Sequence, residues 1–176
     1  MLLEPQPGPY ASLDALWEDQ SRVVRLRCAL DAECGQRSLY VVSYTHKHLH
    51  PFADQIASFS RSYVEAECSR YIWRPTDDCV ASIAVPTIDW GTLVHKHGPF
   101  DVVTIDADGF DGEILHLVDF SEAPPAIILY EHRHLTPEMQ GRCRRRLEQQ
   151  GYTLKQVNKA DTLATRLPQS VAHHRV

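Results

Sequence analysis

The chain has 176 residues, 43% of them hydrophobic and 23% charged, which is typical of one soluble globular domain and excludes coiled coils, collagen and disordered chains. With 18 Lys and Arg against 23 Asp and Glu, the net charge is −5. This charge removes the broad attraction to phosphate on which most nucleic-acid binding depends, so we expect no nucleic-acid partner. No apolar run approaches the ~20 residues that cross a bilayer, and residues 1–5 lack the basic start of a secretory signal. We therefore expect a cytoplasmic protein without a membrane partner.

Short apolar runs alternate with amphipathic stretches, which predicts an α/β domain around a mainly parallel sheet. In chain order, we expect a strand ending at Leu3, a helix over 10–19, strands over 23–26 and 38–43, a helix over 61–68, a helix ending at His97, a strand over 100–106, a helix over 112–118, a strand over 126–131, a helix over 137–150, and strands over 152–157 and 162–165. The turn at 31–35 is expected to join its two flanking strands into a hairpin. Residues 44–80 are predicted to be irregular and to form a substrate lid.

The cysteines are odd in number and lack paired C-x-x-C spacing. Both observations argue against a disulfide framework and against a zinc ribbon. We therefore expect reduced thiols at all five positions, which are Cys28, Cys34, Cys68, Cys79 and Cys143.

Three of the predicted strands end in a carboxylate, namely Glu4, Asp106 and Glu131. In an open parallel sheet the ligand crevice lies outside the carboxyl ends of the strands, so these residues are the first candidates for a site. A carboxylate at such a position can accept hydrogen bonds from both hydroxyls of a ribose. The alternative for Glu4 is a solvated loop acid.

The segment 106–112 places three carboxylates between a predicted buried strand and a helix start. Acids at a helix N-terminus stabilise its dipole by roughly 0.3–1 kcal/mol each, which explains Asp108 and Asp111 without a ligand. A calcium loop of the EF-hand type is excluded, because the ligand and glycine positions do not match. Asp106 ends the strand that we expect to be most buried, so we assign it a functional role.

Two groups of histidines are candidates for chemistry. His46, His48 and His50 alternate, so an extended backbone would point them to one face, as a metal site requires, although an exposed loop explains them equally well. His132 and His134 directly follow Glu131 and could act as general bases near neutral pH; the alternative is a surface turn.

Four separated segments occur in the order seen in FkbM-type methyltransferases: 3–6 (LEPQ), 55–59 (QIASF), 104–111 (TIDADGFD) and 129–135 (LYEHRHL). The resemblance runs from about residue 2 to residue 165, which makes 1–166 the domain and 167–176 a polar tail. It implies a Rossmann-like class I methyltransferase fold, S-adenosylmethionine as cofactor, and methyl transfer to a hydroxyl of a sugar or natural product as small-molecule acceptor.

The same resemblance implies roles for individual residues. Glu4 would hold the cofactor ribose, Ala29 and Leu30 would border the adenine, and Asp106 would lie near the methionine end. Acceptor-binding residues would be Gln55, Ser58 and Phe59, with Glu131 and His132 closing the other side of the pocket. His132, His134 or Asp106 would take the proton of the acceptor. No metal is expected, although a variant that uses Asp106, Glu131 and a histidine stays open.

The sequence departs from this family at its start. Family members begin with a strand and a glycine-rich turn that cradles the cofactor, whereas this sequence starts one strand later and its glycines do not form such a segment. We therefore expect an N-terminally truncated fold without its central first strand, and weak or no cofactor binding. Two open strand edges should lead either to a homodimer or to direct pairing of the strands that end at Glu4 and Asp106. The alternative function is a non-catalytic Rossmann-like binding module that has lost the cofactor site.

Overall fold

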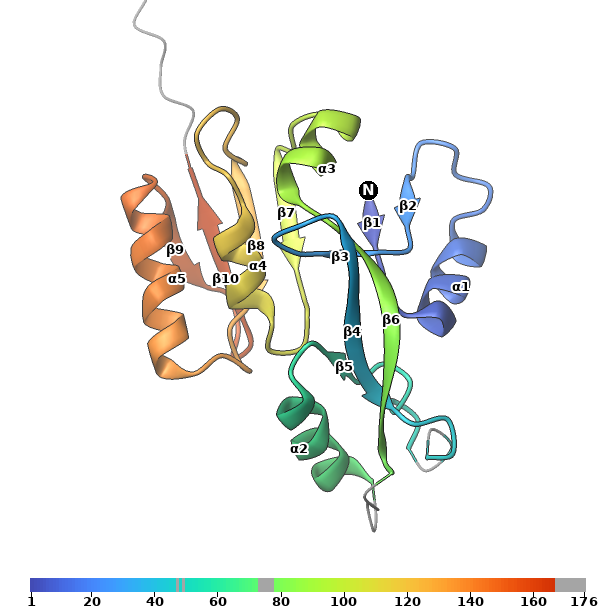
Figure 1. The fold of residues 1–176 in the computed structure, drawn as a ribbon. Coiled ribbons are helices and arrows are strands. Elements are labelled where there is room, and N and C mark those ends of the chain that lie inside the picture. Colours follow the sequence, from blue (N-terminus) through green and yellow to red (C-terminus); the bar gives the residue numbers. More distant parts are fainter. Residues whose placement is uncertain (47, 49, 73–77, 167–176) are drawn as a thin grey trace, which may run out of the picture.

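The computed structural model describes residues 1–46, 48, 50–72 and 78–166 as a mixed α/β fold (Figure 1). The predicted polar tail, 167–176, lies outside the described residues. The described elements are β1 (Leu2–Leu3), α1 (Pro7–Leu16), β2 (Arg25–Leu26), β3 (Ala29–Leu30), β4 (Gly35–Val42), β5 (Ala57–Ser58), α2 (Arg61–Tyr71), β6 (Val80–Ile88), α3 (Trp90–His97), β7 (Val102–Ile105), α4 (Asp111–Leu117), β8 (Ile127–Glu131), α5 (Pro137–Gln149), β9 (Thr153–Gln156) and β10 (Asp161–Thr165).

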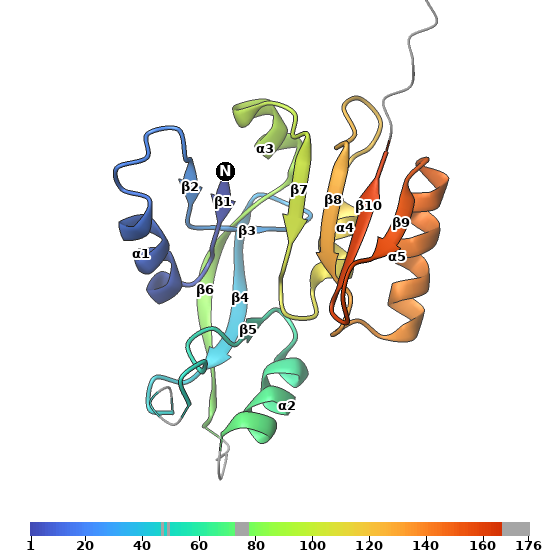
Figure 2. The ribbon, with the colours of Figure 1, turned by 180° about the vertical axis from the view of Figure 1, so that it is seen from behind.

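One sheet has the strand order β7-β8-β10-β9, with β7 and β8 parallel and the other pairs antiparallel. Helices α4 and α5 cover one of its faces, as the two opposite views show (Figures 1 and 2). The main core lies here, and Ile128, Leu115 and Leu147 are fully buried in it. Burial of such side chains stabilises the fold by roughly 1.5–3 kcal/mol each, so this half supplies much of the rigidity beneath the site.

A second sheet has the order β3-β6-β4-β5 and corrects two expectations. Strand β6 pairs antiparallel with β4 over the whole length of β4, and its last residues pair parallel with β3. The predicted hairpin across residues 31–35 is therefore wrong, because β4 pairs with β6, whose paired residues lie 38 to 52 positions further along the chain. Strand β6 itself was not predicted, although its burial alternates from Ser82 to Thr87 with Pro86 on the exposed side. The prediction of a mainly parallel sheet is also wrong, since four of the seven pairings between described strands are antiparallel.

The third sheet is the short parallel pair β1-β2. β1 lies beside β7 without pairing to it, so the expected direct closure between these two strands is wrong. β7 is consequently an edge strand in the described part of the chain, and its Val102 is 57% exposed, whereas the sequence predicted a buried strand. β1, β7 and β8 run in the same direction, so the residues that follow them, Glu4 and Asp106, and the last residue of β8, Glu131, lie toward the same end of the molecule (Figure 2).

Two further expectations concern the cysteines and the membrane. All five cysteines are free, as predicted from their number and spacing. None of the helices in the described part of the chain has the length and the apolar composition that a membrane crossing needs.

Candidate functional site

A cavity of about 570 Å³ lies between β1 and β7, bordered by loops from the second sheet. This volume is in the range of small-molecule and cofactor sites. The cavity brings together seven residues that the sequence had singled out from four separate segments, namely Glu4, Ala29, Leu30, Gln55, Ser58, Phe59 and Asp106.

Glu4 stands at one side of the cavity, directly after β1. Its backbone N–H donates to the carbonyl of Leu26, which extends the β1-β2 ladder and fixes where the side chain emerges. Its carboxylate Oε1 accepts a hydrogen bond from the backbone N–H of Gln6 at 2.7 Å. Burial raises the pKa of Glu4 above its usual value. The residue is thus a positioned, partly desolvated acceptor rather than a solvated loop acid.

The wall next to Glu4 is apolar. Ala29 and Leu30 form β3 and are both buried, held in place by the parallel pairing of β3 with the end of β6. Trp90 and Phe100 also line the cavity and meet edge to face, with ring centroids 5.7 Å apart. Such a wall suits a flat, weakly polar group.

Residues of the 55–59 segment form the opposite rim. Ser58 is buried and its Oγ accepts a hydrogen bond from the backbone N–H of Ser60, while the Phe59 ring meets Phe110 edge to face at 5.1 Å. The guanidinium of Arg37 lies 4.1 Å from the centre of the Phe59 ring. Part of the predicted lid is thus ordered by an aromatic pair and a cation–π contact.

The loop after β7 has an unusual backbone. Asp108 and Gly109 both have positive φ, 47° and 86°, which turns the chain sharply before α4. Asp111 stabilises this turn, because its carboxylate accepts hydrogen bonds from the backbone N–H groups of Ala107 and Gly109, both at 3.2 Å. Asp111 is fully buried, and burial raises its pKa to about 7. Its explanation as an acid that stabilises the helix dipole is therefore incomplete.

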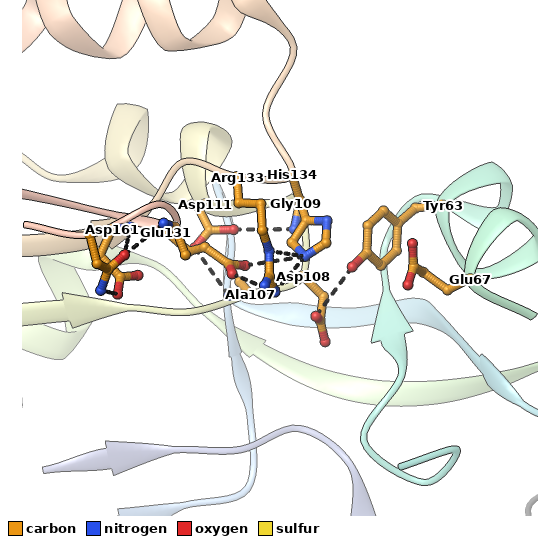
Figure 3. A network of polar contacts seen from close by, with 12 residues as sticks. Tyr63, Glu67, Ala107, Asp108, Gly109, Asp111, Glu131, Arg133, His134 and Asp161 are labelled. Carbon is orange, nitrogen blue, oxygen red and sulfur yellow. Dashed lines mark hydrogen bonds and ion pairs between the residues drawn. The ribbon is translucent and has the colours of Figure 1, made fainter. Parts of the chain in front are cut away.

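Asp106 and Asp108 occupy different positions in this loop. Asp106 is exposed at the end of β7 and lines the cavity. Asp108 also lines the cavity, but it turns toward α2, where the hydroxyl of Tyr63 donates to its Oδ1 at 3.3 Å (Figure 3). Burial and the nearby charge of Asp106 raise the pKa of Asp108 to about 6.

A polar cluster connects Asp108 to the end of β8 (Figure 3). Glu131 is 8% exposed, and its carboxylate lies 3.0 Å from the Arg133 guanidinium and 3.7 Å from Nε2 of His134. Arg133 also donates to His134 Nε2, from Nη2 at 3.0 Å and from Nε at 3.2 Å. The His134 ring meets Tyr63 edge to face at 5.4 Å. Glu131 and His134 thus lie beside the cavity, next to Asp108, without lining it.

The His132 side chain contacts β9 and β10 instead of this polar cluster. Its Nδ1 is 3.0 Å from Thr162 Oγ1 and its Nε2 is 3.3 Å from the side-chain nitrogen of Gln156, so both ring nitrogens contact β9 and β10. It therefore does not join the other predicted site residues. The alternating histidines 46, 48 and 50 do not contribute to the one candidate metal cluster in the described part of the chain, and His46 lies in a turn with Nδ1 2.7 Å from Ser43 Oγ.

Sequence reasoning missed Tyr63 and Arg133, and it took Asp108 for a helix-dipole acid. The sequence around Tyr63 does not indicate a functional role, because Tyr63 reaches Asp108 only through the packing of α2 against the loop after β7. The Asp108-Gly109 pair does indicate the unusual backbone of this loop, since this dipeptide favours turns with positive φ.

Compared with protein-family models, with curated proteins and with solved structures, the chain matches none.

Proposed function

We propose that this chain is an S-adenosylmethionine-dependent O-methyltransferase domain that acts on a hydroxyl of a small acceptor molecule. The main support for the proposal is one cavity between β1 and β7 that is lined by residues from separate motifs. The sequence had assigned these residues to cofactor binding, acceptor binding and proton transfer. The strand arrangement supports a Rossmann-like sheet, in which the gap between β2-β1 and β7-β8-β10-β9 corresponds to the first, central strand.

The residues on the β1 side fit a nucleoside. Glu4 offers a carboxylate, set by its bond from Gln6, to the two ribose hydroxyls. Ala29 and Leu30 offer an apolar surface to the adenine. The bound cofactor supplies an electrophilic methyl group on sulfur, so the chain needs only to align the acceptor oxygen and receive its proton.

The residues on the β7 side fit the acceptor. Asp108 lines the cavity and has a pKa raised to about 6, so it is mostly ionised at neutral pH yet basic enough to take up a proton. Asp106 lines the same cavity and is exposed to it. Phe59 and Phe110 provide apolar contact for the carbon skeleton of an acceptor.

Saturation-transfer NMR with S-adenosylmethionine tests the cofactor assignment, because it detects weak ligands. We expect weak binding, since the described residues supply a ribose acceptor and an adenine wall but no glycine-rich turn between β1 and β7. Glu4→Gln should reduce affinity about tenfold or more, as for a hydrogen bond to a charged group. Glu18→Gln, an exposed acid on the same N-terminal segment, is the matched control.

Signals that are not displaced by S-adenosylhomocysteine, or that persist unchanged in Glu4→Gln, would reject the cofactor site. The open gap also favours a second candidate, a binding module that holds an acceptor-like molecule without methyl transfer. That candidate predicts saturation transfer to a hydroxylated natural product or sugar and none to S-adenosylmethionine.

A further inference from the structure

We propose that Asp108, Glu131 and His134 form a binding site for a divalent cation such as Mn²⁺ or Mg²⁺. One ligand atom from each of the three residues lies within 4.8 Å of the other two. The residues come from the loop after β7, the end of β8 and the loop before α5, so the site would join three elements of the main sheet at the rim of the cavity (Figure 3).

The separation of these atoms suits a small octahedral ion after a modest closure. With bonds of about 2.1 Å, adjacent ligands of such an ion lie roughly 3 Å apart and opposite ligands roughly 4 Å apart. Nε2 of His134 and Oε2 of Glu131 are already 3.7 Å apart. Asp108 is only partly buried and its one side-chain hydrogen bond to Tyr63 is 3.3 Å long, so its carboxylate can turn toward the other two.

The guanidinium of Arg133 already lies between two of the three proposed ligands, so this position accommodates a positive charge. The Arg133 guanidinium contacts Oε1 of Glu131 and donates to Nε2 of His134. An arginine only donates, so Nε2 accepts these bonds and directs its lone pair at the same guanidinium that the Glu131 carboxylate contacts. The Arg133 side chain is 60% exposed, so its contact is weak and it can move away when an ion enters.

The donor set indicates the class of metal. Two carboxylates and one imidazole without a thiolate favour hard or borderline divalent ions over Cu(I), and the cysteines lie outside the cluster. Three protein ligands leave several positions of an octahedral ion open. If the proposed function holds, one of these positions takes the acceptor hydroxyl and lowers its pKa; this last step rests on that function, whereas cation binding does not.

Titration of the full chain with Mn²⁺, followed by the electron paramagnetic resonance signal of the free ion, tests the site. No S-adenosylmethionine is present, so the result is independent of the cofactor assignment. We expect one Mn²⁺ per chain, displaced by excess Mg²⁺. Glu131→Gln and His134→Ala should each weaken binding at least tenfold.

His132→Ala and Glu122→Gln are the matched controls. The first removes a neighbouring imidazole that faces β10, and the second neutralises an exposed acid. Both variants should bind Mn²⁺ as the unaltered chain does. Arg133→Gln should tighten binding roughly two- to fivefold by removing the competing guanidinium. If a variant loses its fold by circular dichroism, paramagnetic broadening in the unaltered chain decides instead: Mn²⁺ should broaden the His134 ring signals more than those of His132. Absence of binding, binding that survives both Glu131→Gln and His134→Ala, or equal broadening of the two rings would overturn the proposal.

Discussion

The hydroxyl of Tyr63 donates to the carboxylate of Asp108 across 3.3 Å, and this bond ties α2 of the second sheet to the loop that follows β7 of the main sheet. The same Tyr63 ring packs against His134. One side chain thus sets the position of a candidate base and of a candidate metal ligand, which makes it the contact through which the two halves of the site depend on each other.

Tyr63→Phe should raise the pKa of Asp108 further above its present value of about 6, because the hydrogen bond from Tyr63 stabilises the ionised carboxylate. Carbon-detected NMR titration of the aspartate carboxyls, with chelator present to keep metal away, measures this change. Tyr10→Phe is the matched control, since its hydroxyl contacts only the carbonyl of Arg25 at 3.5 Å, far from this loop. A lower pKa of Asp108 in Tyr63→Phe would contradict the assigned role of the bond.

Stability should fall as the pH rises from about 4 to 7. The folded-state pKa values of Asp108 and Asp111 are raised to about 6 and about 7, so the folded chain binds more protons than the unfolded chain in this window. For one such group the free energy of unfolding falls by about 1.4 kcal/mol per pH unit between its unfolded and folded pKa values. Urea denaturation at a series of pH values measures the slope.

Asp111→Asn should flatten that pH dependence, because it removes the buried titrating group. It should also lower stability at pH 5, since an amide has one acceptor oxygen for the two backbone N–H groups that Asp111 now satisfies. Asp19→Asn, at an exposed position, should leave the slope as it is. An unchanged slope in Asp111→Asn would show that other groups dominate the titration.

Gly109→Ala should destabilise the fold by about 1–2 kcal/mol. The residue has a φ of 86°, and an added Cβ would lie 3.2 Å from the Tyr63 ring and 3.6 Å from Cβ of His134. Gly8→Ala is the control, because a Cβ there meets nothing within 4 Å and the residue lies in α1, where alanine is favoured. Thermal unfolding of the two variants gives the comparison, and equal melting temperatures would contradict the strain assigned to the loop.

Hydrogen exchange should alternate along β7. The carbonyl of Asp101 accepts from Ile127 of β8, so Val103 and Ile105 also direct their backbone groups toward β8, whereas Val102 and Thr104 direct theirs into the cavity. The amides of Val102 and Thr104 should therefore exchange much faster in NMR measurements. Uniform protection along the strand would mean that a further strand, from another copy or another segment, pairs with this edge.

The sequence predicted best those features that short segments encode by themselves. Helix α3 begins after the cap Asp89 and ends at Gly98, whose φ is 85°, and both signals are local. The strand-end acids Glu4 and Asp106 were likewise found from a rule about where strands stop. Strand β6 was missed because its partner β4 is distant in sequence and because Pro86, which has no backbone donor, argues against a strand although the surrounding residues alternate.

The polar cluster was predicted only in part. Glu131 and His134 were candidates because they end or follow a strand, whereas Asp108 and Tyr63 have ordinary local explanations as a helix-dipole acid and a residue on a helix face. These residues come together only through the contact between α2 and the loop after β7, and that contact cannot be predicted from any one segment.

Among the described strands, β1 and β7 each leave one edge unpaired, and these two edges limit the direction in which a further strand can pair with both. Both strands run the same way, so an incoming segment can extend both ladders in parallel register only if it runs that way too. A two-fold axis perpendicular to the sheet reverses strand direction, so two copies that meet through their β7 edges about such an axis would pair antiparallel. The β7 strand of the second copy would then run opposite to β1 of the first copy and could not pair with it in parallel. Parallel pairing with both edges at once therefore requires a single strand of one polarity.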